Sequence, residues 1–181
     1  EDARMAAAYQ VYYGKPFDMS QGSATEAWVK AFAKNGPLPT DSDGPASEAV
    51  GAPGQKEPFM GLISTAKYRD VAKGKLHMAI CTGMQPFVGL STPAFGLIST
   101  KTKSPNAARL LIHYLMTEEG ISNQTVDGKV SGNGSIPPHA KEASGVHGVW
   151  EQVLQYQSTS ALPDYDARQR WSDIWRLNFT R

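Results

Sequence analysis

The sequence predicts an α/β fold, because short apolar runs bounded by Gly, Pro or small polar residues alternate with segments of helical periodicity. Hydrophobic residues make up 40% of the 181 residues and charged residues 19%, which is typical of a packed globular chain. Eighteen Lys and Arg oppose 17 Asp and Glu, so the formal net charge is only +1. This charge balance gives no field that would attract nucleic acid, and we expect no nucleic-acid partner.

The first third of the chain predicts three helices. Residues 3–13 are rich in Ala, carry aromatic residues at helical spacing, and end before a Gly-Lys-Pro stop. Ser23 and Glu26 have the spacing of a capping box and precede apolar residues at three- and four-residue steps. Residues 46–50 follow capping residues and Pro45, which predicts a short helix whose first N–H groups are free.

The middle of the chain predicts strands. Residues 59–63 and 76–81 are short apolar runs that suit buried strands, and residues 68–74 between them predict one or two helical turns. Residues 87–99 are apolar but interrupted by Gly and Pro, which predicts an extended strand that crosses between two lobes. The order strand, helix, strand is typical of an α/β layer.

The last part of the chain predicts helices over residues 104–116, 148–156 and 166–177. Ser104 and Pro105 stand at the capping and first helical positions of the first of these. We expect inward packing of three tryptophans on the other two helices, Trp150, Trp171 and Trp175.

Three pairs of polar residues lie at the ends of predicted elements: Ser42 with Asp43, Ser64 with Thr65, and Ser91 with Thr92. In open α/β sheets, ligands bind beyond the carboxyl ends of strands, where hydroxyls and helix N-termini offer donors to an anion. Each pair taken alone is equally explained as an ordinary cap or turn.

Other chemistries have weaker support in the sequence. Ser64 and Lys67 match the S-x-x-K spacing of some acyl-enzymes, but no Lys-Thr-Gly follows, so we expect no enzyme. The four histidines show no i, i+4 pair, which disfavours a zinc site, and the single Cys81 excludes an internal disulfide. No run approaches the roughly 20 apolar residues of a membrane span, and we expect a soluble chain without a cofactor.

Seven segments together resemble a known family. They are residues 27–37, 40–44 together with 48–50, 61–64, 92–98, 104–109, 115–120 and 136–138. Their order resembles the C-terminal half of bacterial periplasmic solute-binding proteins of ABC importers, in the ferric-iron-type branch of the type II group. The resemblance covers nearly the whole chain.

The resemblance implies two α/β lobes joined by crossing strands, with a solute clamped between them. Residues 1–90 would form most of the second lobe, 91–103 the crossing hinge strand, and 104–181 the C-terminal helices that return to the first lobe. It also implies an N-terminal lobe outside these residues and an ABC permease as partner. The location would be the periplasm, or the cell exterior as an anchored lipoprotein, and the exposed lobe surface would favour a dimer.

The resemblance also narrows the ligand. In iron-binding relatives two adjacent tyrosines follow the strand that corresponds to residues 61–63, whereas this chain has Lys67 and a single Tyr68. Iron would leave Tyr68 as the metal ligand, while Lys67 favours a sugar phosphate or phosphonate. The site predicted for this small anionic solute is Ser42, Asp43, Gly44, Ser64, Thr65, Lys67, Tyr68, Ser91 and Thr92. A ferric-iron carrier and the ligand-sensing subunit of a signalling receptor are the alternatives.

Overall fold

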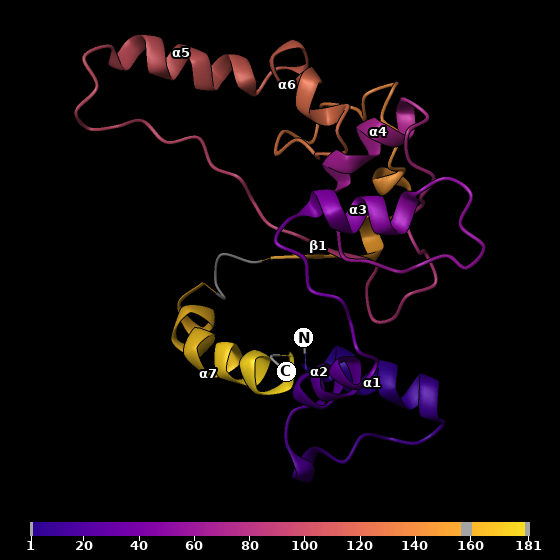
Figure 1. Cartoon of the computed structure of the whole chain (residues 1–181). Helices are drawn as coiled ribbons and strands as arrows, with labels where there is room; N and C mark the ends of the chain where they lie inside the picture. The colour runs from indigo at the N-terminus through magenta and orange to yellow at the C-terminus, as the bar shows by residue number, and fades with distance from the viewer. Residues whose placement is uncertain (1, 157–160, 180–181) are drawn as a thin grey trace. The chain divides into compact units, whose positions relative to one another are not determined.

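The computed structural model describes residues 2–156 and 161–179, and these are mainly helical with two short strands (Figure 1). They form two compact units. Unit 1 comprises Glu1–Pro39, Thr82–Thr92 and Glu151–Arg181, and unit 2 comprises Thr40–Cys81 and Pro93–Trp150. Each unit is therefore built from segments that are distant in the sequence.

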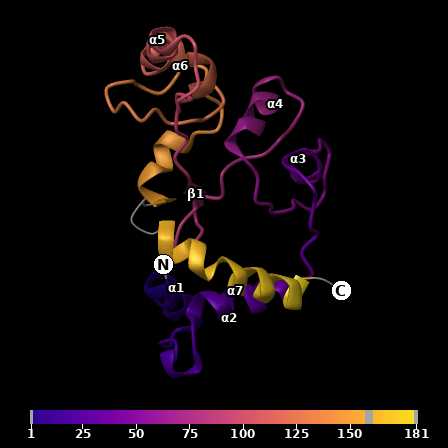
Figure 2. The ribbon, with the colours of Figure 1, turned by 90° about the vertical axis from the view of Figure 1, so that its left-hand side faces the viewer.

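Three helices dominate unit 1, namely α1 (Asp2–Tyr13), α2 (Ala24–Lys34) and α7 (Ala161–Phe179), and the 3-10 turn η1 (Met19–Gln21) connects the first two. The predicted cap of α2 is confirmed, because Ser23 Oγ accepts a hydrogen bond from the Glu26 N–H at 3.2 Å. Helix α2 contacts both α1 and α7, and α7 lies alongside it in Figure 2.

Aromatic rings join α2 to α7. The Trp28 ring stacks on Phe32 with ring centroids 5.3 Å apart, and Phe32 lies 5.7 Å from the ring of Phe179. Arg170 Nη2 on α7 adds an ion pair to Glu26 Oε2 on α2 at 3.0 Å. The inward packing expected for the tryptophans is only partial, since half of the Trp175 side chain is exposed.

A two-stranded parallel sheet completes unit 1. Strand β1 (Gly89–Ser91) pairs with β2 (Val153–Gln155) in the register Gly89 to Val153, and the Tyr156 N–H extends the ladder to the Ser91 carbonyl at 2.9 Å. The helix predicted over residues 148–156 is wrong, because a 3-10 segment, η3 (Val146–Gln152), leads directly into β2. Pairing with a strand 64 residues away in the sequence, Gly89 with Val153, thus overrides the local helical periodicity.

The described residues of unit 2 include four α-helices, the 3-10 turn η2 (Thr65–Lys67) and most of η3. The helices are α3 (Asp43–Gly51), α4 (Tyr68–Ala72), α5 (Pro105–Leu115) and α6 (Glu118–Thr125). The end of α3 packs closely on Leu76, since a Cβ on Gly51 would lie 3.0 Å from the Leu76 Cβ. The His77 N–H donates to the Gly51 carbonyl at 2.7 Å. Buried side chains in this unit include Tyr68 and Val146.

The strands predicted over residues 59–63 and 76–81 do not form, and that predicted over 87–99 shrinks to β1. An extended segment becomes a strand only when a neighbour satisfies its backbone groups. Residues 59–63 have no such partner in the structure, and Phe59 and Leu62 are 64% and 78% exposed. These strands were predicted from apolar composition, which does not by itself provide a neighbouring strand for backbone hydrogen bonds.

The helices predicted from clear caps fare better. Helix α5 begins at Pro105 as predicted, although the Ser104 side chain makes no capping hydrogen bond. Helix α6 was not predicted as a separate element. It begins after Thr117, whose Oγ1 accepts from the Gly120 N–H at 3.1 Å, and the Thr-Glu-Glu run is the signal that marks this second start.

The boundaries of the compact units cut across the predicted division into 1–90, 91–103 and 104–181. Residues 40–81 fall in one unit while the rest of 1–90 falls in the other, and α5 and α7 belong to different units. The assignment of these stretches to lobes of a binding protein, and the α/β class that accompanies it, remain predictions.

Candidate functional site

Seven of the nine predicted site residues lie in unit 2, and the first group of them begins α3. Ser42 is extended, and its hydroxyl makes no capping hydrogen bond to the helix. Asp43 and Gly44 form the first turn, where backbone N–H groups lack intrahelical partners. The Asp43 carboxylate suits this position, because negative charge is favourable at a helix N-terminus.

The second group surrounds η2, which contacts α3. Ser64 Oγ caps this turn by accepting from the Ala66 N–H at 3.2 Å, and Thr65 Oγ1 donates to the Gly128 carbonyl at 3.3 Å. Lys67 is half-buried and has no ion-pair partner among the residues that the structure describes. Of the η2 side chains, Lys67 therefore remains available to a ligand.

Tyr68 is 5% exposed and starts α4. Burial, reinforced by the negative charge of Glu142, raises the pKa of its phenol above 10.0. Ferric iron binds the phenolate form of tyrosine, which this environment disfavours. Tyr68 is thus placed as a core residue rather than as an open metal ligand.

The remaining two predicted residues belong to unit 1. Ser91 ends β1, and its carbonyl accepts the Tyr156 N–H. Thr92 follows as an exposed residue. The predicted site is therefore divided between the two units, with Ser91 and Thr92 apart from the other seven residues in this division.

A buried polar centre, which the sequence did not predict, lies next to Thr65 of η2. The Glu142 side chain is only 6% exposed, and its carboxylate accepts hydrogen bonds from the Ser144 N–H and, at 3.0 Å, from the Gly145 N–H. Ser144 is also buried, and its Oγ accepts from the Val146 N–H at 3.1 Å. Its sequence signal is a carboxylate two residues before Ser-Gly, typical of a side-chain-closed turn.

Gly128 allows this centre to close. Its φ of +77° lies in the left-handed region, and a Cβ there would come within 2.8 Å of Ser144 Oγ, 2.9 Å of Thr65 Cβ and 3.2 Å of Glu142 Oε1. His147 adds an imidazole whose buried Nδ1 has no hydrogen-bond partner and lies 3.9 Å from Glu142 Oε2. The centre fixes the backbone on which Thr65 and Tyr68 stand.

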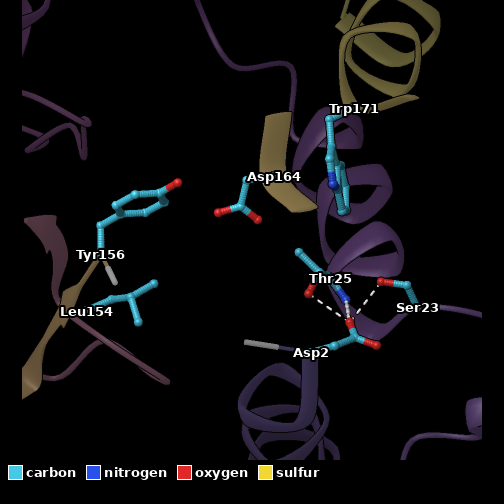
Figure 3. A pocket seen from close by; sticks show the side chains of 7 residues that line it. All are labelled: Asp2, Ser23, Thr25, Leu154, Tyr156, Asp164 and Trp171. Atoms are coloured by element: carbon cyan, nitrogen blue, oxygen red, sulfur yellow. Dashed lines mark hydrogen bonds between the residues drawn. The ribbon is translucent and has the colours of Figure 1, made fainter. Parts of the chain in front are cut away.

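Unit 1 contains a separate open cleft, which we call the acidic cleft (Figure 3). Its volume is about 350 Å³. It is lined by Asp2, Ser23, Thr25, Leu154, Tyr156, Asp164 and Trp171. The lining comes from α1, α2, the end of β2 and α7, so segments from both ends of the described chain meet here.

Asp2 is held by donors from the start of α2. Its Oδ1 accepts from Ser23 Oγ, from the Thr25 N–H and from Thr25 Oγ1, each at 2.8 Å (Figure 3). These hydrogen bonds, that from the Thr25 N–H first, lower the pKa of Asp2 from 3.8 to about 2. Asp2 is therefore an anion at every pH above this value.

The opposite part of the cleft carries Tyr156 and Asp164. The pKa of Tyr156 is raised chiefly by burial and secondly by its hydrogen bond to the Asp164 carboxylate. In Figure 3 the Tyr156 hydroxyl points toward Asp164, and Trp171 lies on the other side of that carboxylate. The lining thus combines two carboxylates with two aromatic rings.

No group of three or more His, Cys, Asp or Glu side chains is arranged to hold a metal ion within residues 2–156 and 161–179. No helix in the described part of the chain combines the length and the apolar character needed to cross a membrane. Comparison with protein-family models, with curated proteins and with solved structures gave no match.

Proposed function

We propose that this chain is part of the extracytoplasmic substrate-binding component of an ABC importer, which captures a small anionic solute of the sugar phosphate or phosphonate type. The protein binds and releases this solute without making or breaking bonds, so it is not an enzyme. The proposal rests on the family resemblance of the sequence and on the donor groups of unit 2.

The observation that carries the proposal is that Lys67, which stands on a turn that contacts α3, has no ion-pair partner in the described part of the chain. A phosphate is recognised by free backbone N–H groups at a helix N-terminus and by a cationic side chain, and unit 2 contains both. The uncapped Ser42 hydroxyl is a further donor. Asp43 opposes an anion at the same helix end, so it would limit affinity in this chain.

Unpartnered apolar side chains support the proposed N-terminal lobe and permease as partners. In unit 2, Leu110 and Leu111 of α5 are 70% and 57% exposed, and Leu97 before this helix is 89% exposed. Large apolar side chains that are this exposed are common on surfaces that another protein covers. A component of this kind would work in the periplasm, or outside the cell as an anchored lipoprotein.

Amide NMR of the isotope-labelled chain with a hexose phosphate and with methylphosphonate tests the anion site. We expect shifts of the Gly44 and Ser64 amides that saturate with ligand. Lys67→Gln should weaken binding roughly tenfold, because a charge-assisted hydrogen bond contributes about 1.5 kcal/mol or more. Asp43→Asn should strengthen it, since it removes the opposing charge.

The matched control is Lys103→Gln, which removes an exposed lysine of the same unit. Equal weakening by Lys67→Gln and Lys103→Gln would reduce the effect to general charge and reject the site. Ferric citrate separates the iron alternative, because a tyrosinate complex produces a purple charge-transfer band. We expect no such band, and a band lost in Tyr68→Phe would replace the anion by iron.

A further inference from the structure

We propose that the acidic cleft of unit 1 binds a small organic cation, an ammonium group with an apolar body. The residues that line this cleft differ from those of the proposed anion site in unit 2. The proposal does not depend on the proposed importer function. Its ligand is defined by the charge, the aromatic walls and the size of the cleft.

The charge of the lining is negative and is not neutralised from within. Asp2 remains ionised down to about pH 2, and Asp164 supplies a second carboxylate. Among the residues that the structure describes, the lining includes no Lys, Arg or His. The hydroxyls of Ser23 and Thr25 donate to Asp2, so they are not free to stabilise an incoming anion. An anionic ligand would meet two like charges, whereas a cation would meet two opposite ones.

The aromatic walls favour an organic cation over a bare metal ion. Tyr156 and Trp171 stand on the two sides of Asp164 (Figure 3), and the faces of such rings attract ammonium groups within about 6 Å. A metal ion would need a third hard ligand, and no such cluster exists within the described residues. Leu154, which also lines the cleft, adds contact for an alkyl body.

Arg170 is a cation next to the cleft residue Trp171, and the Glu26 carboxylate partly offsets its charge. The Arg170 guanidinium lies 5.9 Å from the centroid of the Trp171 ring, near the limit of a cation–π contact. Its Nη2 lies 3.0 Å from Glu26 Oε2, and the same carboxylate pairs with Lys30 Nζ at 2.7 Å, so Glu26 offsets only part of the Arg170 charge. The carboxylates of Asp2 and Asp164 line the cleft and are not bound to this group, so they balance the charge of a ligand.

Choline and its neutral carbon isostere, in which carbon replaces nitrogen, test the site on the full chain. We expect choline to shift the Trp171 indole N–H resonance in a saturable way at millimolar concentration, as an open cleft implies. The neutral isostere should bind about fivefold more weakly, which corresponds to the upper end, about 1 kcal/mol, of the contribution of one exposed ion pair. Asp164→Asn should lose a similar factor for choline and little for the isostere.

Asp173→Asn is the matched control, because Asp173 lies on the same helix and pairs with Gln169 outside the cleft lining. The proposal is overturned if choline and the isostere bind equally, if sodium chloride alone gives the same shifts, or if Asp173→Asn weakens binding as much as Asp164→Asn. In Trp171→Leu, binding is followed by the Thr25 amide resonance instead of the indole, and the preference for choline should be lost while the amide spectrum of α2 remains that of a folded chain. Methylphosphonate should leave the Trp171 resonance unchanged, which keeps this test separate from that of unit 2.

Discussion

Unit 2 is organised around buried polar groups, whereas unit 1 is held by helix caps, ring contacts and an ion pair nearer its surface. In unit 2 the Glu142 carboxylate is almost fully buried and a glycine is needed beside it. In unit 1 the Asp2 carboxylate and the Arg170 pair are partly solvated. Removing the hydrogen-bond partner of a buried polar group costs more free energy of folding than removing that of a solvated group. Substitutions in unit 2 should therefore reduce stability more than those in unit 1.

The largest effect is expected for Gly128→Ala. The added Cβ must adopt a left-handed φ and displace Ser144 Oγ and Thr65 Cβ, so the free energy of unfolding of unit 2 should fall by about 3 kcal/mol. Urea unfolding followed by residue-resolved hydrogen exchange measures this. Gly134→Ala is the control, because a Cβ there meets nothing within 4 Å. Equal stability of the two variants would show that the polar centre is not tightly packed.

Glu142→Gln should come next. The amide can accept one of the two backbone N–H groups but presents its own N–H₂ to the other, so we expect a loss of about 2 kcal/mol. The pKa of Tyr68 should also fall, because the charge of Glu142 helps to raise it. Unfolding curves and the ultraviolet titration of Tyr68, identified by difference from Tyr68→Phe, measure both. Glu57→Gln, at an exposed position, should change neither.

The acid stability of unit 1 should depend on Asp2 to a smaller extent. The pKa of Asp2 is lowered on folding, so its contribution is complete above the unfolded value of 3.8 and is lost as pH falls through about 2. Because this carboxylate is partly solvated, we expect about 1 kcal/mol. Asp2→Asn should flatten the pH dependence between these values, and Asp166→Asn should not. Parallel acid profiles for wild type and Asp2→Asn would contradict the hydrogen-bonded role of Asp2.

The smallest effect is expected for the pair between Arg170 and Glu26. A solvated ion pair of this kind contributes about 0.5 kcal/mol and is weakened by salt. A double-mutant cycle of Arg170→Gln and Glu26→Gln measures the coupling of α7 to α2 at low and high ionic strength. A coupling above the roughly 1 kcal/mol expected for Asp2 would reverse the order proposed for unit 1.

Local signals in the sequence predicted the helices well and the strands poorly. The cap at Ser23 and the proline at 105 act through neighbouring backbone groups, so their effect is visible in the residues themselves. The sheet depends on the meeting of Gly89 with Val153, and nothing near either residue indicates the other. Apolar composition alone therefore placed strands at 59–63 and 76–81, where no partner strand forms among the described residues.

The candidate sites show the same difference. Ser42, Ser64 and Lys67 were found because hydroxyls and a lysine next to predicted element ends are a local pattern. The acidic cleft was missed, because Asp2 and Asp164 are 162 positions apart by their residue numbers and meet the same cleft only through the packing of α1, α2 and α7. The role of Glu142 was missed for a related reason, since its burial depends on Gly128.

Because β1 pairs with β2, a strand that is translated much later, unit 1 cannot complete its fold early in translation. The chain emerges from its N-terminus, so α1 and α2 are exposed well before β2 and α7 have been translated. The segments of unit 2 are complete by Trp150, before the last part of unit 1 exists. The nascent chain should therefore join α1 to α2 first and complete unit 2 next, while α2 lacks its contact with α7 until α7 has been translated.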